Sequence, residues 1–282
     1  MKYQLLQKQF GINKIENLCN FEIDFPVQDM CLCEDNKLLF LSGNAIGVIT
    51  CKKEIVFPWI VGLNSSSSIY CDGKNTCFVA ESNGAEIKKI DILNKEIESV
   101  LTSLAHKEKI KLYFSKADKN EDGETAITLA NERTLYWVSA QLNRCFKYEG
   151  TTFESVVGNG KAGYSTSNDA KSCMLNNPTG LAFHDEDLYI CDDNHCIRLA
   201  NEQGIKLVAG HPNKIGHQDG KQSLLTSPTK IKASKWLAYF IDDGKVKSFS
   251  YSEYVVATIS NLENIVAIST DNNQNIYALR KD

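Results

Sequence analysis

The sequence predicts an all-β fold, a six-bladed β-propeller closed by N-terminal strands that complete the last blade. Strand-like apolar runs dominate the 282 residues, and helical periodicity is almost absent. One type of strand also recurs six times as a short apolar run, with its last residue at positions 43, 81, 139, 192, 242 and 280. The intervals average about 47 residues, a period typical of propeller blades with four strands each.

The two ends of the chain are expected to share one blade. Two strands, at residues 3–9 and 17–25, precede the first blade, and the last recurring strand leaves the sixth blade with only two C-terminal strands. We therefore expect blade 6 to be formed by about 1–25 plus 262–282, so that residues 1–282 make a single propeller domain. This closure removes exposed sheet edges.

The other elements are placed relative to the recurring strand. The innermost strand of each blade is expected just before it, as at residues 67–70, 179–183 and 228–231, and these stretches carry almost no carboxylates. A Leu-x-x-Pro-Thr step leads into the last two. Helices are expected only as short pieces, at residues 91–101 and 168–174.

Composition excludes several classes of function. The formal net charge is −4, and only 4 of the 31 basic residues are Arg, the side chain that favours base readout and stacking. We therefore expect no nucleic-acid partner. No window approaches the roughly 20 apolar residues that span a bilayer, and residues 1–10 lack the apolar segment of a signal peptide. These observations predict no membrane insertion and a cytoplasmic or otherwise intracellular location.

The ten cysteines are scattered and form no Cys-x-x-Cys pair. Cys31 and Cys33 share one face of a strand by alternation, but the spacing is not that of a zinc ribbon or finger. We expect the cysteines to be free, small apolar side chains buried in a reducing compartment. The sequence thus predicts no metal site, no catalytic residue and no cofactor.

One stretch of the chain is similar to a known family. Residues 157–163, 175–182 and 188–198 read VGNGKAG, LNNPTGLA and LYICDDNHCIR, and together they resemble an NHL repeat. The copy at 208–249 resembles it less closely, and residues 77–90 match only its second half. The resemblance implies a six-bladed propeller that acts as a protein-binding platform, an RNA-binding domain or, rarely, an enzyme.

An acidic residue ends the recurring strand in three blades, as Glu81, Asp192 and Asp242. Each precedes a tight turn, where acidic side chains hydrogen-bond to local backbone N–H groups. A catalytic residue is needed once, whereas a structural one is needed in every blade. We therefore expect these acids to be structural.

One face of the propeller is expected to carry two kinds of polar segment. These are the turns that follow the recurring strands and the Pro-Thr steps that enter the innermost strands. Polar loops on a rigid scaffold are where binding usually occurs. We predict that this face binds a partner protein, with Asn83, Asn143, Pro178, Thr179, Asp193, Asn194, His195 and Asp243 as candidate contacts.

Two weaker patterns suggest alternatives. Residues 118–123 (DKNEDG) match the start of a calcium loop, but Leu129 replaces the bidentate acid at its twelfth position. Alternating lysines at residues 107–111 and 230–232 form stripes that could contact phosphate, or could be solvated edge lysines that deter aggregation. The leading hypothesis is a non-catalytic interaction module or subunit of a larger cellular or viral assembly. The alternatives are a calcium-dependent lactonase-like enzyme and an RNA-binding NHL domain.

Overall fold

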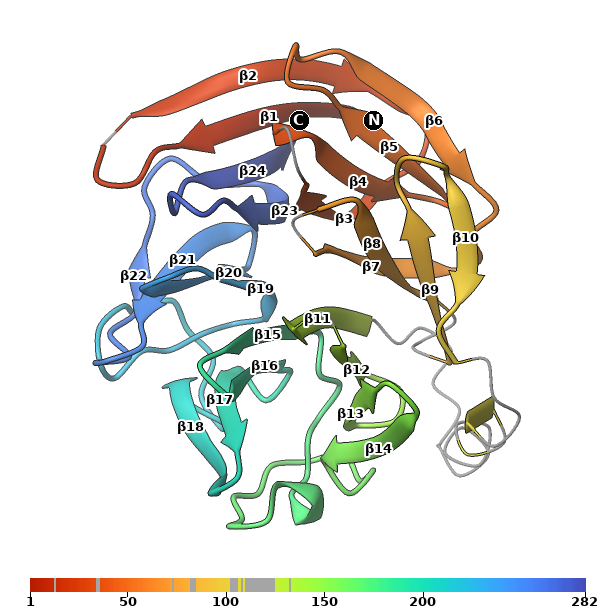
Figure 1. Cartoon of the computed structure of the whole chain (residues 1–282). Coiled ribbons are helices and arrows are strands. Elements are labelled where there is room, and N and C mark those ends of the chain that lie inside the picture. The colour runs from red at the N-terminus through yellow and green to blue at the C-terminus, as the bar shows by residue number, and fades with distance from the viewer. Residues whose placement is uncertain are drawn as a thin grey trace.

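The computed structural model describes residues 1–12, 14–33, 36–72, 74–81, 85–101, 106–107, 109, 125–131 and 133–282. These residues contain six antiparallel sheets of four strands each. The sheets are arranged radially around a central axis (Figure 1). This arrangement confirms the predicted six-bladed β-propeller.

Blades 1 to 3 follow one another along the chain, and the first strand of each lies innermost. Blade 1 contains β3 (Val27–Leu32), β4 (Leu38–Ser42), β5 (Ala45–Ile49) and β6 (Ile55–Val61). Blade 2 contains β7 (Ser66–Cys71), β8 (Thr76–Glu81), β9 (Glu86–Asp91) and β10 (Glu96–Ser99). Blade 3 contains β11 (Thr125–Asn131), β12 (Thr134–Ser139), β13 (Arg144–Glu149) and β14 (Thr152–Val157).

Blades 4 and 5 repeat this order, and blade 6 combines both ends of the chain. Blade 4 contains β15 (Gly180–His184), β16 (Asp187–Asp192), β17 (Cys196–Asn201) and β18 (Gly204–Gly210). Blade 5 contains β19 (Pro228–Ala233), β20 (Leu237–Asp242), β21 (Lys245–Ser250) and β22 (Ala257–Thr258). Blade 6 contains β23 (Ile265–Thr270), β24 (Ile276–Lys281), β1 (Lys2–Lys8) and β2 (Ile15–Glu22).

The ring closes as the sequence predicts. Strand β1 pairs with β24 in antiparallel register, with Leu5 opposite Leu279. The amide of Asp282 also donates to the carbonyl of Lys2 at 3.1 Å, and the two termini lie close together (Figure 1). The N-terminal strands therefore complete the last blade.

The core is divided among the interfaces between blades. Each of six clusters of buried apolar side chains combines residues from two adjacent blades. In the cluster between blades 2 and 3, Trp137 is fully buried and stacks on Phe146 and Phe153, with ring centroids 5.5 Å away. Because the second strand of each blade is buried on both faces, strands such as β4, β8, β16 and β20 read as nearly continuous apolar runs.

Neither of the two expected helices forms. Residues 91–101 contain the β9–β10 turn and strand β10, and in the turn the Asp91 carboxylate accepts from the amides of Leu93 and Asn94 at 2.8 and 3.0 Å. This local turn bonding competes with helix formation. Residues 168–174 contain only the 3₁₀ turn η3 (Ala170–Ser172).

The expectation that every cysteine is free is wrong for two of the ten. Cys33 and Cys71 form a disulfide between the end of β3 and the end of β7, and the other eight cysteines are free. The cysteine spacing in the sequence did not reveal this disulfide, because its two residues lie on different blades and are far apart along the chain. None of the described helical residues forms a helix long and apolar enough to cross a membrane.

Candidate functional site

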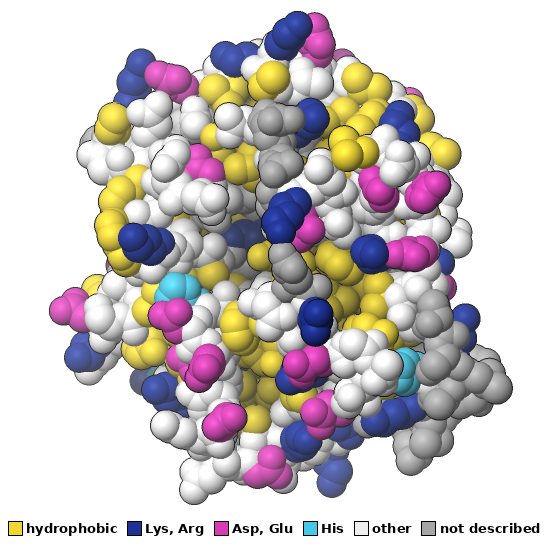
Figure 2. All heavy atoms as spheres, in the orientation of Figure 1, with side chains coloured by type: hydrophobic (Ala, Val, Ile, Leu, Met, Phe, Trp, Pro, Cys, Tyr) yellow, Lys and Arg dark blue, Asp and Glu magenta, His cyan; other side chains and the backbone are white. Residues whose placement is uncertain are grey.

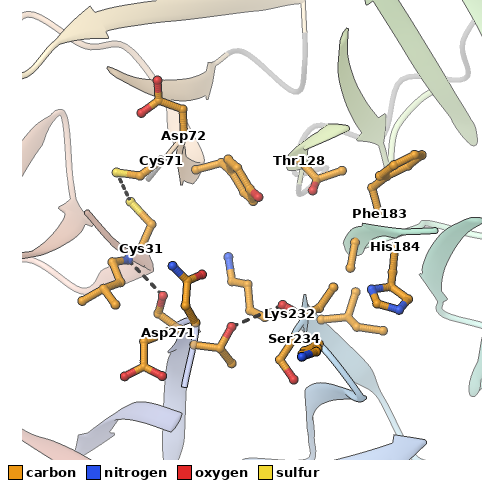
Figure 3. Close-up of a pocket in the computed structure, with 18 of the residues that line it drawn as sticks. Cys31, Cys71, Asp72, Thr128, Phe183, His184, Lys232, Ser234 and Asp271 are labelled. Atoms are coloured by element: carbon orange, nitrogen blue, oxygen red, sulfur yellow. Dashed lines mark hydrogen bonds between the residues drawn. The ribbon is translucent and has the colours of Figure 1, made fainter. Parts of the chain in front are cut away.

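The propeller has two faces. The innermost strands begin at one face and end at the other. We call the face where β15 and β19 begin, at Gly180 and Pro228, the entry face. We call the face where the innermost strands end the pocket face, because a pocket of about 760 Å³ opens there. Its lining includes Cys71, His184 and Ala233, at or next to the last residues of β7, β15 and β19 (Figure 3).

An ion pair crosses the central channel beneath this pocket. Lys232 of β19 lies 3.4 Å from the carboxylate of Asp29 in β3, and the side chain of Lys232 is 13% exposed. Asp29 is almost fully buried and also accepts from the amides of Met30 and Ile69 and the hydroxyl of Ser68, at 2.9 to 3.1 Å. These bonds compensate for burying the carboxylate.

Irregular backbone positions these two side chains. The pairing register shifts between Val27 and Asp29 in β3, which leaves an extra residue in that strand. In β19 the register shifts between Thr229 and Lys232, and Lys230 has a φ of +52°. Such bulges re-aim side chains next to functional sites. Lys232 therefore points into the channel, which corrects its interpretation as a solvated edge lysine.

Three cysteine side chains meet at one wall of the pocket. The sulfur atoms of Cys31, Cys33 and Cys71 all lie within 4.8 Å of one another, and all three residues are buried. The Cys31 and Cys71 sulfurs are 3.0 Å apart (Figure 3). Burial raises the pKa of the Cys31 thiol well above its usual value. With the Cys33–Cys71 disulfide reduced, these three side chains form a group in the described part of the chain that could hold a metal.

Aromatic side chains line the rim of the pocket face. The rings of His184 and Tyr251 stack with centroids 3.8 Å apart. Phe10 in the β1–β2 turn contacts Trp236 in the β19–β20 turn, with ring centroids 6.0 Å apart. The ammonium group of Lys235, a pocket-lining residue, lies 5.0 Å from the Trp236 ring centroid. We call the exposed group Phe10, Ile12, Lys235 and Trp236 the rim patch.

On the entry face, the three repeated acids contact backbone. Glu81 accepts from the amide of Asn64 at 2.8 Å, Asp192 from Asn176 at 3.0 Å, and Asp242 from Thr226 and Ser227 at 2.8 Å each. Each bond joins the end of a second strand to the loop that enters the innermost strand of the same blade. Each carboxylate thus connects the end of the second strand to the entering loop, in addition to any bond within the tight turn that follows it.

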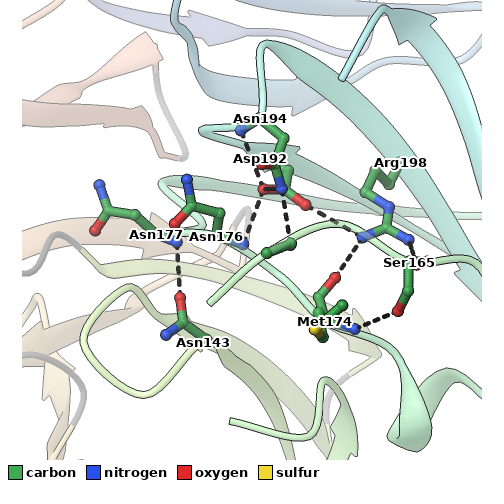
Figure 4. Close-up of polar contacts among 9 residues, drawn as sticks. Asn143, Ser165, Met174, Asn176, Asn177, Asp192, Asn194 and Arg198 are labelled. Carbon is green, nitrogen blue, oxygen red and sulfur yellow. Dashed lines mark hydrogen bonds and ion pairs between the residues drawn. The ribbon is translucent and has the colours of Figure 1, made fainter. Parts of the chain in front are cut away.

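A buried basic residue is coupled to each of two acids. The guanidinium of Arg198 lies 3.3 Å from the Asp192 carboxylate and donates to the carbonyls of Met174, at 2.7 Å, and Ser165 (Figure 4). Lys247 lies 3.3 Å from Asp242 in the next blade. Blades 4 and 5 therefore share a buried ion pair between the acid that ends the second strand and a basic residue of the third strand.

The predicted partner contacts on the entry face take part in bonds between blades. The Asn143 side chain accepts from the amide of Asn177 at 2.8 Å, and the His195 ring bonds to the carbonyl of Thr226 at 2.6 Å. Both residues have a positive φ, as does Asp243. Asn, Asp and His tolerate this conformation better than other side chains, so the turn backbone accounts for the residue types.

The other predicted contacts are placed unevenly. Pro178 and Thr179 are buried, Asp193 and Asn194 are half-buried, and Asp243 is exposed. Asn83 lies outside the described residues, and so do the possible calcium loop at 118–123 and the stripe lysine at 111. Seen along the axis, Lys and Arg side chains are interspersed with Asp and Glu (Figure 2).

Sequence reasoning predicted no site at the pocket residues Lys232, Cys31, Cys33 and Cys71, nor at Asp29, which pairs with Lys232. The sequence did contain a signal for the contact between Cys33 and Cys71. They are 38 positions apart, which equals the interval between the first two recurring strands, at positions 43 and 81. Residues one blade apart occupy equivalent places in adjacent blades. The contact between Asp29 and Lys232 had no such signal, because it joins non-adjacent blades through the channel.

Solved structures resemble the chain in fold. An auxiliary nutrient binding protein from Bacteroides thetaiotaomicron superposes with a TM-score of 0.60 and 14% identity over 95% of this chain and 62% of that chain. A chain of the nidogen/laminin complex gives 0.58 and 13%, over 99% and 97%. Virginiamycin B lyase from Staphylococcus aureus, solved with quinupristin, gives 0.54 and 16%, over 95% and 85%.

These similarities show a shared propeller fold. The chain spans about 62% of the length of the Bacteroides binding protein. No protein-family model matches the chain, and no curated protein matches it.

Proposed function

We propose that the chain is a non-catalytic, NHL-like β-propeller that acts as a protein–protein interaction module within a larger assembly. The observation that carries this proposal is the rim patch on the pocket face. Phe10 is 44% exposed, Ile12 49% and Trp236 54%. Aromatic side chains are enriched at the centres of protein interfaces, where Trp often contributes most of the binding energy.

The surroundings of the patch favour a protein partner. The backbone of Phe10 is held by a hydrogen bond from its amide to the Asn275 side chain at 3.0 Å, and its ring contacts Trp236 in the free protein. Lys235 belongs to the rim patch and also lines the polar pocket, so the patch and the pocket are adjacent. An apolar centre next to polar groups is the usual composition of an interface, and a preordered one reduces the entropy lost on binding.

The NHL-like assignment rests on the repeated contacts of the entry face. In blades 2, 4 and 5, an acid that ends the second strand accepts from the backbone of the entering loop. These are the positions at which the sequence resembles the NHL repeat. One similar chain belongs to a nutrient binding protein and another to the nidogen/laminin complex, which is consistent with a binding role here.

The test is purification of the tagged chain from its native cells, followed by identification of stoichiometric partners. We expect the double variant Phe10→Ser, Trp236→Ser to lose the partner that the wild type retains. Ile215→Ser is the matched control, since Ile215 is 62% exposed but lies in the loop that leads to the entry face. A wild-type protein that purifies as a monomer without a partner would overturn the proposal.

The entry face predicted from the sequence is the alternative docking surface, and the same assay separates the two. Asp193→Lys places a positive charge among the predicted contacts on that face. Loss of the partner in this variant, with retention in the double rim variant, would move the interface to the entry face.

A further inference from the structure

The cysteine cluster at the pocket wall has the donor set of a zinc site. Cys31, Cys33 and Cys71 place three sulfur atoms within 4.8 Å of one another. A tetrahedral Zn²⁺ with Zn–S bonds of about 2.3 Å needs sulfur atoms about 3.8 Å apart, so small side-chain adjustments suffice. Soft thiolate ligands select Zn²⁺ or Cu⁺ over hard cations.

The three ligands come from two rigid strand ends. Cys31 lies in β3, and Cys33 follows it with its amide bonded to the carbonyl of Lys37 at 2.8 Å. Cys71 is the last residue of β7 and pairs with Cys77 in β8. Because β3 and β7 are neighbouring innermost strands, the ring itself brings the cysteines together.

We propose that the reduced protein binds one Zn²⁺ through the thiolates of Cys31, Cys33 and Cys71, with the fourth coordination position directed into the pocket. All three residues line the pocket, so water or a partner's side chain can reach that position. Three protein ligands plus one open position is the arrangement of zinc sites that exchange a ligand.

The charge near the cluster suits such a complex. Three thiolates and one Zn²⁺ carry a net charge of −1. The Lys232 ammonium group projects into the same pocket that the three cysteines line (Figure 3). A fixed cation beside an anionic metal complex offsets the cost of burying it.

Zinc binding and the disulfide exclude each other. A dithiol reductant transfers two electrons and two protons to the Cys33–Cys71 disulfide, which gives two thiols, while the reductant becomes a cyclic disulfide. The three thiols then bind Zn²⁺ and release three protons. The pocket wall thus alternates between a disulfide form without metal and a reduced form with zinc.

The test uses the full chain and Co²⁺ as a spectroscopic probe that Zn²⁺ displaces. We expect the reduced wild type to bind a single equivalent of Co²⁺, with a thiolate-to-metal charge-transfer band in the near ultraviolet. Cys31→Ala and Cys71→Ala should weaken binding by more than the roughly 10–100-fold that loss of a residue supporting a ligand costs. Cys191→Ala is the matched control, because Cys191 is fully buried outside the cluster and should leave binding unchanged.

A second measurement does not depend on how the variants fold. Wild-type protein oxidised with a diazene oxidant to complete the Cys33–Cys71 bond should bind no Co²⁺, and subsequent reduction should restore binding. The proposal is overturned if the reduced wild type shows no stoichiometric, thiolate-bound metal, or if the oxidised form binds it equally well.

Discussion

On the entry face, polar side chains bond to the backbone of their own or the next blade, whereas on the pocket face they converge on an open pocket. His195 of blade 4 bonds to the carbonyl of Thr226 as the chain enters blade 5. On the pocket face, Lys232 and Asp29 meet across the channel. Both faces carry polar residues at strand ends, so polarity alone does not distinguish a residue that holds the blades together from one that can contact a ligand. The intramolecular partner makes that distinction.

The largest effect tests the structural role of the entry face. Asp192→Ala leaves the fully buried Arg198 without its carboxylate and the Asn176 amide without its acceptor. Removal of one partner of a buried ion pair costs about 3–5 kcal/mol, which we expect as a lower free energy of unfolding in urea. Asp243→Ala, at an exposed position of the corresponding turn in blade 5, is the control and should cost much less.

The same stability measurement on the channel ion pair tests how the two faces differ. Lys232→Met removes the cation next to Asp29, but Asp29 keeps three hydrogen bonds and the pocket admits water. We expect a loss of about 1–3 kcal/mol, below that of Asp192→Ala. A double-mutant cycle with Asp29→Asn measures the coupling. If Lys232→Met lowers the free energy of unfolding more than Asp192→Ala does, the pocket face contributes more to stability than the entry face.

A single bond between blades should have a smaller effect. His195→Ala removes the contact to the carbonyl of Thr226, and a neutral hydrogen bond contributes about 1 kcal/mol. We expect a drop of at least this size in the free energy of unfolding, because Ala also tolerates the positive φ of this position less well than His. The rim variant Trp236→Ser should change it by less than about 0.5 kcal/mol, because that side chain is more than half exposed. The reverse order would contradict the division between the faces.

The smallest effect depends on pH. Lys171, next to the entry face, donates to Glu154 at 2.8 Å, which lowers the pKa of this carboxyl below its usual value near 4.5. A lowered folded-state pKa stabilises the protein above the unfolded value, and this contribution is lost as the pH falls through the folded-state value. Both side chains are largely exposed, so we expect less than about 1 kcal/mol.

The measurement for this pair is the difference in Tm between the wild type and Lys171→Ala. It should be small near pH 7 and disappear near pH 3. A difference that grows on acidification would show that the pair acts otherwise.

The fold was predictable because it depends on a period. A strand that recurs about every 47 residues determines the number of blades, and the shortage of strands at the C-terminus requires the N-terminal pair. The expected helix at 91–101 failed for a local reason, since the Asp91 carboxylate favours a turn that periodicity does not reveal.

The candidate site was less predictable because its contacts run between blades. Asp29 and Lys232 are 203 positions apart, and their meeting depends on closure of the ring and on the positive φ of Lys230. The turn residues Asn143 and His195 were recognised as polar and clustered. Their partners, Asn177 and Thr226, become evident only when adjacent blades are in place.

We propose that partners bind the pocket face while bonds across the entry face hold the blades together. Hydrogen–deuterium exchange of the chain, alone and within its purified assembly, distinguishes the two faces. We predict protection in the assembly at the β1–β2 turn around Phe10 and the β19–β20 turn around Trp236, with little change at residues 193–195. Protection confined to residues 142–144, 193–195 and 243–244 would contradict the claim.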